Sequence, residues 1–168
     1  ALLGFRNAIS AVADSRSLVA TIIPVFGVGN SMPVIQVQGG NKFSTLLLAS
    51  FNSLLVDYVL RQKACGGNLN YYVLKQLPVL FPHTYDEVYQ WLSGMQVLRN
   101  WFLLRVLELT YTAWDLEPFA QDCGWNVPPF RWDEERRFLL RCELDAAFFH
   151  LYLRSEANGE WRMAKKED

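Results

Sequence analysis

The chain has 168 residues, of which 51% are hydrophobic and 20% are charged, and its formal net charge is −1. This balance is that of a folded globular domain, and it excludes wholesale disorder and a coiled coil. A net charge near zero also argues against a generally basic nucleic-acid binder. A chain of this length is expected to form about one domain with a core of its own.

The first half predicts a small mixed sheet with a buried helix. Residues 17–26 are apolar and rich in β-branched side chains, which is typical of a strand, and 33–38 predict a second short strand. Over 44–63 the apolar residues recur at helical spacing, which predicts one buried helix. We expect the glycines at 66–67 to end this helix, and a short extended stretch to follow over 69–80.

The second half predicts helices. Thr84 and Glu87 have the spacing of a capping box, in which each side chain satisfies the backbone amide of the other residue. We therefore expect a helix from about residue 85 to residue 112, either continuous or broken near Ser93 and Gly94. Asp133 is the expected N-cap of a last helix, which ends near Leu153.

Together these elements predict an α+β fold, with a mixed small sheet and a buried helix in the N-terminal half and a helical C-terminal lobe. We assign residues 1–80 to the mixed α/β lobe and 81–168 to the helical lobe of the same compact unit. The chain opens on ALLGFRNAIS, which is apolar and has no initiator Met, so we expect a fragment of a longer protein.

The cysteines and histidines predict neither a metal site nor a disulfide framework. The three cysteines include no Cys-x-x-Cys pair, and the two histidines, His83 and His150, lie far apart. We expect reduced thiols in a cytoplasmic protein. No apolar run reaches the ~18 residues of a membrane span, so no membrane partner is expected.

Positive charge is concentrated in the first half. Residues 1–75 contain six Lys or Arg and two Asp, a net charge of +4, whereas the remainder carries −5. Such an asymmetry can mark a half that faces a polyanion, and an ordinary solvated surface is the alternative. Residues 61–75 combine cations and amides with a glycine-rich turn, a set that can bind phosphates and base edges. From these residues alone, a C-capped helix with two surface cations and a turn is the simpler explanation and the favoured one.

Several stretches resemble a known family. They are 4–17 (GFRNAISAVADSRS), 52–63 (NSLLVDYVLRQK), 66–79 (GGNLNYYVLKQLPV), and the helical segments 105–111 (RVLELTY) and 141–152 (RCELDAAFFHLY). In order and spacing they resemble the target-recognition region of Eco57I-like and TaqI-like adenine-specific DNA methyltransferases. Those enzymes belong to bacterial restriction-modification and phage-defence systems. The resemblance covers about residues 4–153.

The resemblance implies that this chain reads double-stranded DNA for its own methyltransferase domain, located upstream. That missing domain would use S-adenosylmethionine to methylate the N6 amine of adenine after flipping the base. Within this chain we expect no catalytic residue, no metal and no cofactor. The parent protein is expected to be an adenine-specific DNA methyltransferase, with or without restriction activity.

The resemblance also implies which residues contact DNA. Contacts to phosphates or guanines are expected from the cations Arg6, Arg16, Arg61 and Lys63. Contacts to base edges or sugars are expected from Gln62, Asn68, Asn70 and Lys75. The glycines Gly66 and Gly67 would permit a close approach of the backbone.

The rival hypothesis is a protein-interaction module. The helical half is rich in aromatic residues that could dock a methyltransferase, helicase or nuclease subunit without touching DNA: Trp91, Trp101, Phe102, Trp114, Phe119 and Trp125. A fused nuclease is the enzymatic alternative, and it would require metal-dependent cleavage of DNA.

Overall fold

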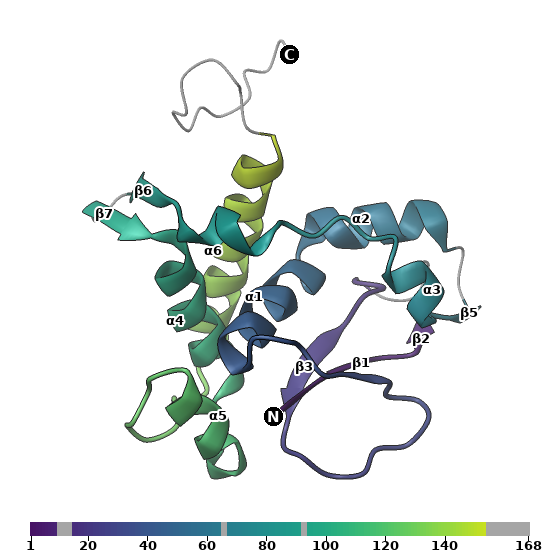
Figure 1. Cartoon of the computed structure of the whole chain (residues 1–168), viewed down its shortest axis with the longest axis horizontal. Coiled ribbons are helices and arrows are strands. Elements are labelled where there is room, and N and C mark those ends of the chain that lie inside the picture. Colours follow the sequence, from purple (N-terminus) through teal and green to yellow (C-terminus); the bar gives the residue numbers. More distant parts are fainter. Residues whose placement is uncertain (10–14, 65–66, 92–93, 154–168) are drawn as a thin grey trace.

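A computed structural model describes residues 1–9, 15–64, 67–91 and 94–153 (Figure 1). The fold is α+β, as predicted, with small antiparallel sheets and a set of helices. Gly66, expected in the turn after the buried helix, lies outside the described residues. So does the tail beyond residue 153, which was assigned to the helical lobe.

Three strands form the main sheet. The central strand β1 (Leu2–Phe5) lies between β3 (Ala20–Ile23) and β4 (Val34–Ile35), and both pairings are antiparallel. The strands predicted over 17–26 and 33–38 are therefore confirmed, although the observed strands are shorter. Strand β1 is buried along most of its length because α1 packs against β1 and β3.

The single helix predicted over 44–63 is two helices. They are α1 (Asn41–Phe51) and α2 (Leu54–Lys63), and their axes differ by 64°. Ser53 makes the break, because its hydroxyl accepts a hydrogen bond from the Val56 amide and caps α2. The apolar spacing continues through the break, so periodicity alone predicted one helix. By length and composition, none of the described helices can cross a membrane by itself, and only the bent α1–α2 pair meets that criterion.

A second pair of strands joins the N-terminal segment to the turn after α2. Strand β2 (Ala8–Ile9) pairs antiparallel with β5 (Gly67–Asn68). The stretch over 69–80, predicted to be extended, instead contains a helical turn, α3 (Tyr71–Leu74). This turn forms because the Asn70 side chain accepts a hydrogen bond from the Val73 amide, which caps the turn.

The helix predicted from residue 85 to residue 112 begins only at Leu98. Before α4 (Leu98–Thr110) come a 3₁₀ helix, η1 (Pro82–Asp86), and a hairpin of β6 (Val88–Trp91) and β7 (Gly94–Val97). The predicted capping box does not form, because Glu87 has extended backbone angles after η1. The β-branched and aromatic residues of β6 favour a strand. The C-terminal lobe is thus helical except for this hairpin.

The last elements are η2 (Trp114–Leu116), α5 (Glu117–Asp122) and α6 (Glu134–Tyr152). The predicted N-cap of α6 is confirmed, since the Asp133 carboxylate accepts a hydrogen bond from the Arg136 amide at 2.9 Å.

One hydrophobic cluster contains residues from both halves of the chain. It includes Phe5 of β1, Phe102 of α4 and Phe148 of α6, all at most 1% exposed. Helix α1 contacts the main sheet on one side and α4 on the other, so it lies at the centre of the molecule (Figure 1). Each buried side chain of this size stabilises the fold by about 1.5–3 kcal/mol.

Candidate nucleic-acid interface

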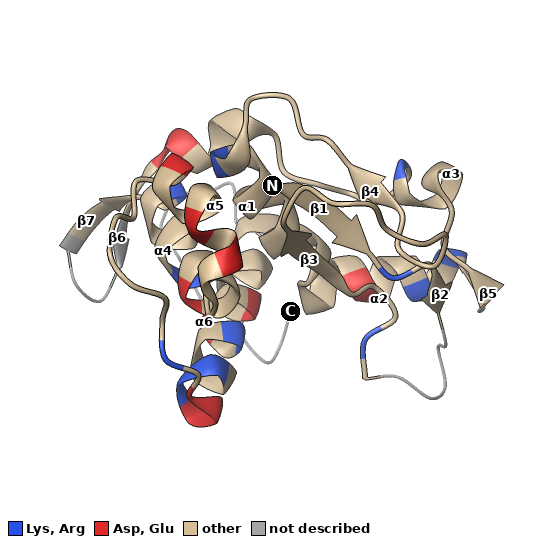
Figure 2. Ribbon diagram, turned by 90° about the horizontal axis from the view of Figure 1, so that it is seen from below, with Lys and Arg blue, Asp and Glu red and all other residues tan. Residues whose placement is uncertain are grey.

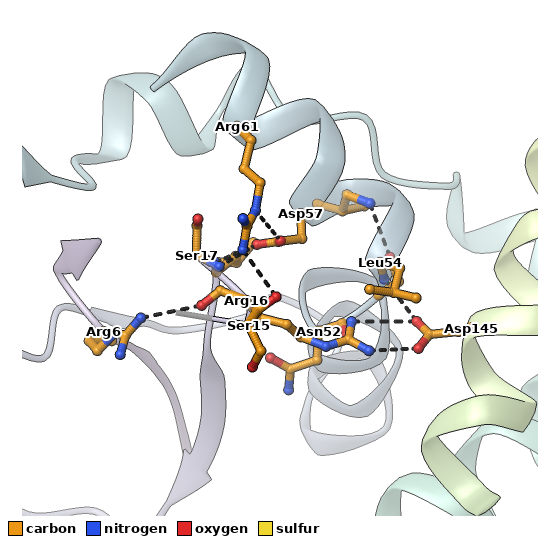
Figure 3. A network of polar contacts seen from close by, with 12 residues as sticks. Arg6, Ser15, Arg16, Ser17, Asn52, Leu54, Asp57, Arg61 and Asp145 are labelled. Carbon is orange, nitrogen blue, oxygen red and sulfur yellow. Dashed lines mark hydrogen bonds and ion pairs between the residues drawn. The ribbon is translucent and has the colours of Figure 1, made fainter. Parts of the chain in front are cut away.

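A buried carboxylate holds the N-terminal segment against α2. Asp57 is 3% exposed, and its Oδ1 accepts hydrogen bonds from the backbone amides of Ser17 at 2.7 Å and Leu18 at 2.8 Å. Its Oδ2 accepts a hydrogen bond from Nε of Arg61, one helical turn further along, at 2.8 Å. Arg61 also donates to the Ser15 carbonyl at 3.0 Å, as Figure 3 shows. Asp57 and Arg61 together therefore fix the path of residues 15–18.

A second carboxylate joins the same segment to α6. The Oδ2 of Asp145 accepts a hydrogen bond from Nη2 of Arg16 at 2.6 Å. Its Oδ1 accepts one from the Leu54 amide at 2.8 Å, so Asp145 also satisfies the first amide of α2. Nη1 of Arg16 donates to the carbonyl of Asn52 (Figure 3). This ion pair lies where the N-terminal segment, the α1–α2 break and α6 meet.

The break between α1 and α2 is also joined to the sheet. The side-chain amide of Asn52 accepts a hydrogen bond from the Ala20 amide and donates one to the Ala20 carbonyl, both at 2.9 Å. Asn52 thus pairs with β3 as a neighbouring strand would. We call Arg16, Asn52, Asp57, Arg61 and Asp145 the polar joint.

The polar joint contains two of the predicted DNA-contacting cations. The guanidinium groups of Arg16 and Arg61 donate to carboxylates and carbonyls of the chain itself. Arg6 is half-buried, and its Nη2 donates to the Arg16 carbonyl at 3.3 Å (Figure 3). These three arginines therefore organise the chain's own N-terminal segment, and their positions give them a structural role.

Two residues of the predicted turn also have structural roles. Gly67 has a φ of +91°, a conformation that glycine adopts without a steric penalty. It pairs with Ile9 in the β2–β5 ladder. Asn70 caps α3 through the Val73 amide at 3.1 Å. The fully buried Leu69 lies between them and anchors the turn in the core.

The remaining predicted residues lie on the surface. Gln62, Lys63, Asn68 and Lys75 are exposed, and their side chains form no hydrogen bond or ion pair within the described part of the chain. We call these four residues the basic end. The C-terminal end of α2, the β2–β5 pair and α3 lie side by side in both ribbon views, and Figure 2 shows Lys and Arg positions there.

The basic end has little negative charge near it along the chain. Among the described residues of 1–75, Asp57 is the only acidic residue, and it is buried and paired with Arg61. The surplus of Asp and Glu lies in the second half of the chain (Figure 2). Exposed ammonium and amide groups without competing carboxylates suit contacts to phosphates and base edges.

Sequence reasoning did not include Asn52, Asp57 or Asp145 in the site, although all three lie in the family-like stretches. A signal existed for Asp57, because it is a lone acid on the apolar face of a predicted helix. Such an acid is buried only when it is paired. The partner of Asp145 is 129 positions away, and no local pattern could have identified it.

No family model, no curated protein and no solved structure matches this chain. Within the described residues, no group of three or more His, Cys, Asp or Glu side chains is placed to hold a metal ion.

Proposed function

We propose that this chain is a DNA target-recognition domain. It would read a specific sequence in double-stranded DNA for an upstream domain of the same protein, which would transfer a methyl group from S-adenosylmethionine to the N6 amine of adenine. The resemblance of residues 4–153 to adenine methyltransferase recognition regions supports this proposal. The observation that carries it is the basic end, an exposed group of cations and amides that no described interaction within the chain occupies.

The proposal divides the predicted residues into two groups. Lys63 and Lys75 bind phosphates, and the side-chain amides of Gln62 and Asn68 bind base edges, for which bidentate pairing to adenine is the favoured geometry. The polar joint holds α2 and the N-terminal segment in place, because recognition requires side chains presented on a rigid support. Arg16 and Arg61 are then positioning residues, and they do not touch DNA.

The test is selection from a random duplex pool by this chain, followed by affinity measurements across a salt titration. The proposal predicts enrichment of one sequence motif and an affinity that falls as salt rises, because phosphate binding releases counterions. Selection without an enriched motif would contradict sequence recognition. Affinity that does not change with salt would contradict phosphate contacts.

Three of the aromatic residues predicted to dock a partner, Trp101, Phe102 and Phe119, are buried in the core. An exposed apolar face on α6 instead favours this second function, the docking of a protein partner. Phe138, Leu139, Phe149 and Leu153 are 59%, 54%, 44% and 64% exposed. They lie on one side of α6, and together they span about 20 Å along the helix axis at 1.5 Å per residue. An apolar stripe of this length on a surface marks an interaction site.

We assign this α6 face to the upstream methyltransferase domain, since a recognition domain must be held against its catalytic half. The groove between α6 and α2 extends the face, because Phe149 and Leu153 line it together with Leu54 and Tyr58. DNA reading at the basic end and docking at the α6 face use different residues. The two functions are therefore compatible in one chain.

A further inference from the structure

A cavity of about 400 Å³ lies between β3, α1, α4 and α6. Its apolar lining includes Leu18, Ala49, Val106, Leu109 and Leu144. Its charged lining consists of Arg16, Arg137, Arg141 and Asp145. Its volume is in the range of sites that bind small organic molecules.

The charges that line this cavity do not cancel. Arg16 and Asp145 form a close ion pair at 2.6 Å, and Asp145 accepts a further hydrogen bond from Leu54. The carboxylate is thereby compensated. Arg137 and Arg141 add two positive charges from successive turns of α6.

Neither of these two arginines has a close carboxylate partner among the described residues. Nη1 of Arg137 donates to the Leu109 carbonyl at 3.0 Å, and its guanidinium lies 3.6 Å from the ring centroid of Trp132. Nη2 of Arg141 is 3.7 Å from a Glu134 oxygen, and both side chains are more than half exposed, at 52% and 71%. An exposed pair at this distance contributes little.

The two guanidinium groups also repel each other. The pKa of Arg137 is lowered, first by burial and then by the positive charge of Arg141. Like charges four residues apart on a helix are destabilising. An anion between them would turn this repulsion into two attractive contacts, while the stacking on Trp132 holds the Arg137 plane in place.

We propose that this cavity binds the phosphate group of an organic phosphate, held between Arg137 and Arg141, with the apolar part of the ligand against Leu18, Val106 and Leu144. Phosphate is favoured over carboxylate because a phosphomonoester carries up to two negative charges and can accept a bidentate fork from each guanidinium. None of these residues belongs to the basic end, so the proposal does not depend on the recognition function.

The test is calorimetric titration of the chain with phenyl phosphate and with inorganic phosphate at low salt. We expect saturable binding of one phenyl phosphate per chain, with weaker binding of inorganic phosphate because the apolar walls are unused. Arg141→Gln and Arg137→Gln should each weaken phenyl phosphate binding about tenfold, the effect of losing one charge-assisted contact. Arg131→Gln is the matched control, because Arg131 is exposed and does not line the cavity.

Trp132 supplies a second measurement. Because Arg137 stacks on its ring, ligand binding should change the tryptophan fluorescence, and Trp132→Phe should abolish that change. Arg141→Gln keeps the experiment decisive if Arg137→Gln unfolds, since within the described part of the chain the Arg141 side chain has only its weak, exposed pair with Glu134. No saturation at millimolar phenyl phosphate, or equal binding by Arg141→Gln, would overturn the proposal.

A duplex titration identifies the source of the phosphate. If the natural ligand is a free organic phosphate, Arg141→Gln weakens phenyl phosphate binding and leaves duplex affinity unchanged. If the phosphate belongs to the DNA backbone, Arg141→Gln weakens duplex binding and reduces its salt dependence. If Arg141→Gln weakens neither phenyl phosphate binding nor duplex binding, the proposal is overturned. Substitution of Lys63 and Lys75, which tests recognition, should leave phenyl phosphate binding unchanged.

Discussion

Arg16 and Asp145 lie 129 positions apart in the chain, and their side chains meet at 2.6 Å. The same carboxylate accepts a hydrogen bond from the first backbone amide of α2, so one acid connects the N-terminal segment, α2 and α6. Since Arg16 also donates to Asn52 at the α1–α2 break, the ion pair connects four parts of the fold. The stability of the polar joint is therefore expected to depend strongly on Asp145.

Asp145→Ala should lower the free energy of unfolding by about 3 kcal/mol. The substitution leaves the Arg16 guanidinium without its carboxylate, and removing one member of a largely buried pair costs about 3–5 kcal/mol. The lower end applies because the Arg16 side chain is 23% exposed. Urea denaturation measures the change. Glu135→Gln, an exposed change on the same helix, should remain within about 0.5 kcal/mol of the parent chain.

Asn52→Asp should destabilise the chain by about 2 kcal/mol. The wild-type amide both donates to and accepts from the backbone of Ala20. A carboxylate cannot donate, so one of its oxygens would face the Ala20 carbonyl unpaired, which costs about 1–3 kcal/mol. Thermal unfolding of the two chains side by side measures this. An unchanged melting temperature would show that the pairing with β3 contributes nothing.

Cys142 should react with iodoacetamide much faster than Cys123. Cys142 is exposed, whereas burial, with a smaller contribution from Asp122, raises the pKa of the Cys123 thiol to about 12. Below that pKa the thiol remains protonated and unreactive, so alkylation of Cys123 should begin only in alkaline solution or after unfolding. Mass spectrometry of a Cys65→Ser chain follows both sites. Equal rates at pH 8 would contradict the buried position of Cys123.

Phe138→Gln with Phe149→Gln should abolish binding of the upstream methyltransferase domain, supplied as a separate polypeptide, to this chain. Both side chains are more than two-fifths exposed, so the free energy of unfolding should change by less than about 0.5 kcal/mol for each. Leu104→Gln is the control, because Leu104 is 50% exposed but lies on α4. If the control weakens association as much as the α6 variants do, the docking face is wrongly assigned.

The sequence predicted the fold class, strands β3 and β4 and the last helix, because local patterns determine these features, but it did not predict the central strand β1 or the β2–β5 pair. It did not predict the break at Ser53, since the apolar spacing continues across it. It also predicted helix for the segment before Leu98, where the structure has η1 and a hairpin. The Thr84–Glu87 spacing resembles a capping box, but that box does not form. Propensity is a weak guide where a short segment packs against a core.

The predicted site residues divide along the same line. The family resemblance placed Arg16, Arg61 and Lys63 together in one candidate set, but it could not distinguish an arginine that donates to its own chain from an exposed lysine. That distinction depends on where Asp57 and Asp145 lie in three dimensions. A contact between residues 129 positions apart is accessible only from the structure.

The central claim, that the basic end binds DNA, is tested most directly by the salt dependence of duplex affinity in a Lys63→Gln, Lys75→Gln chain. We predict weaker binding and a slope of log K against log salt reduced by about 1.8, the loss of two phosphate contacts at ~0.9 each. Lys42→Gln removes an exposed cation from the start of α1, and should leave both quantities nearly unchanged. Unaltered affinity and slope in the double variant, or an equal loss with Lys42→Gln, would contradict the account.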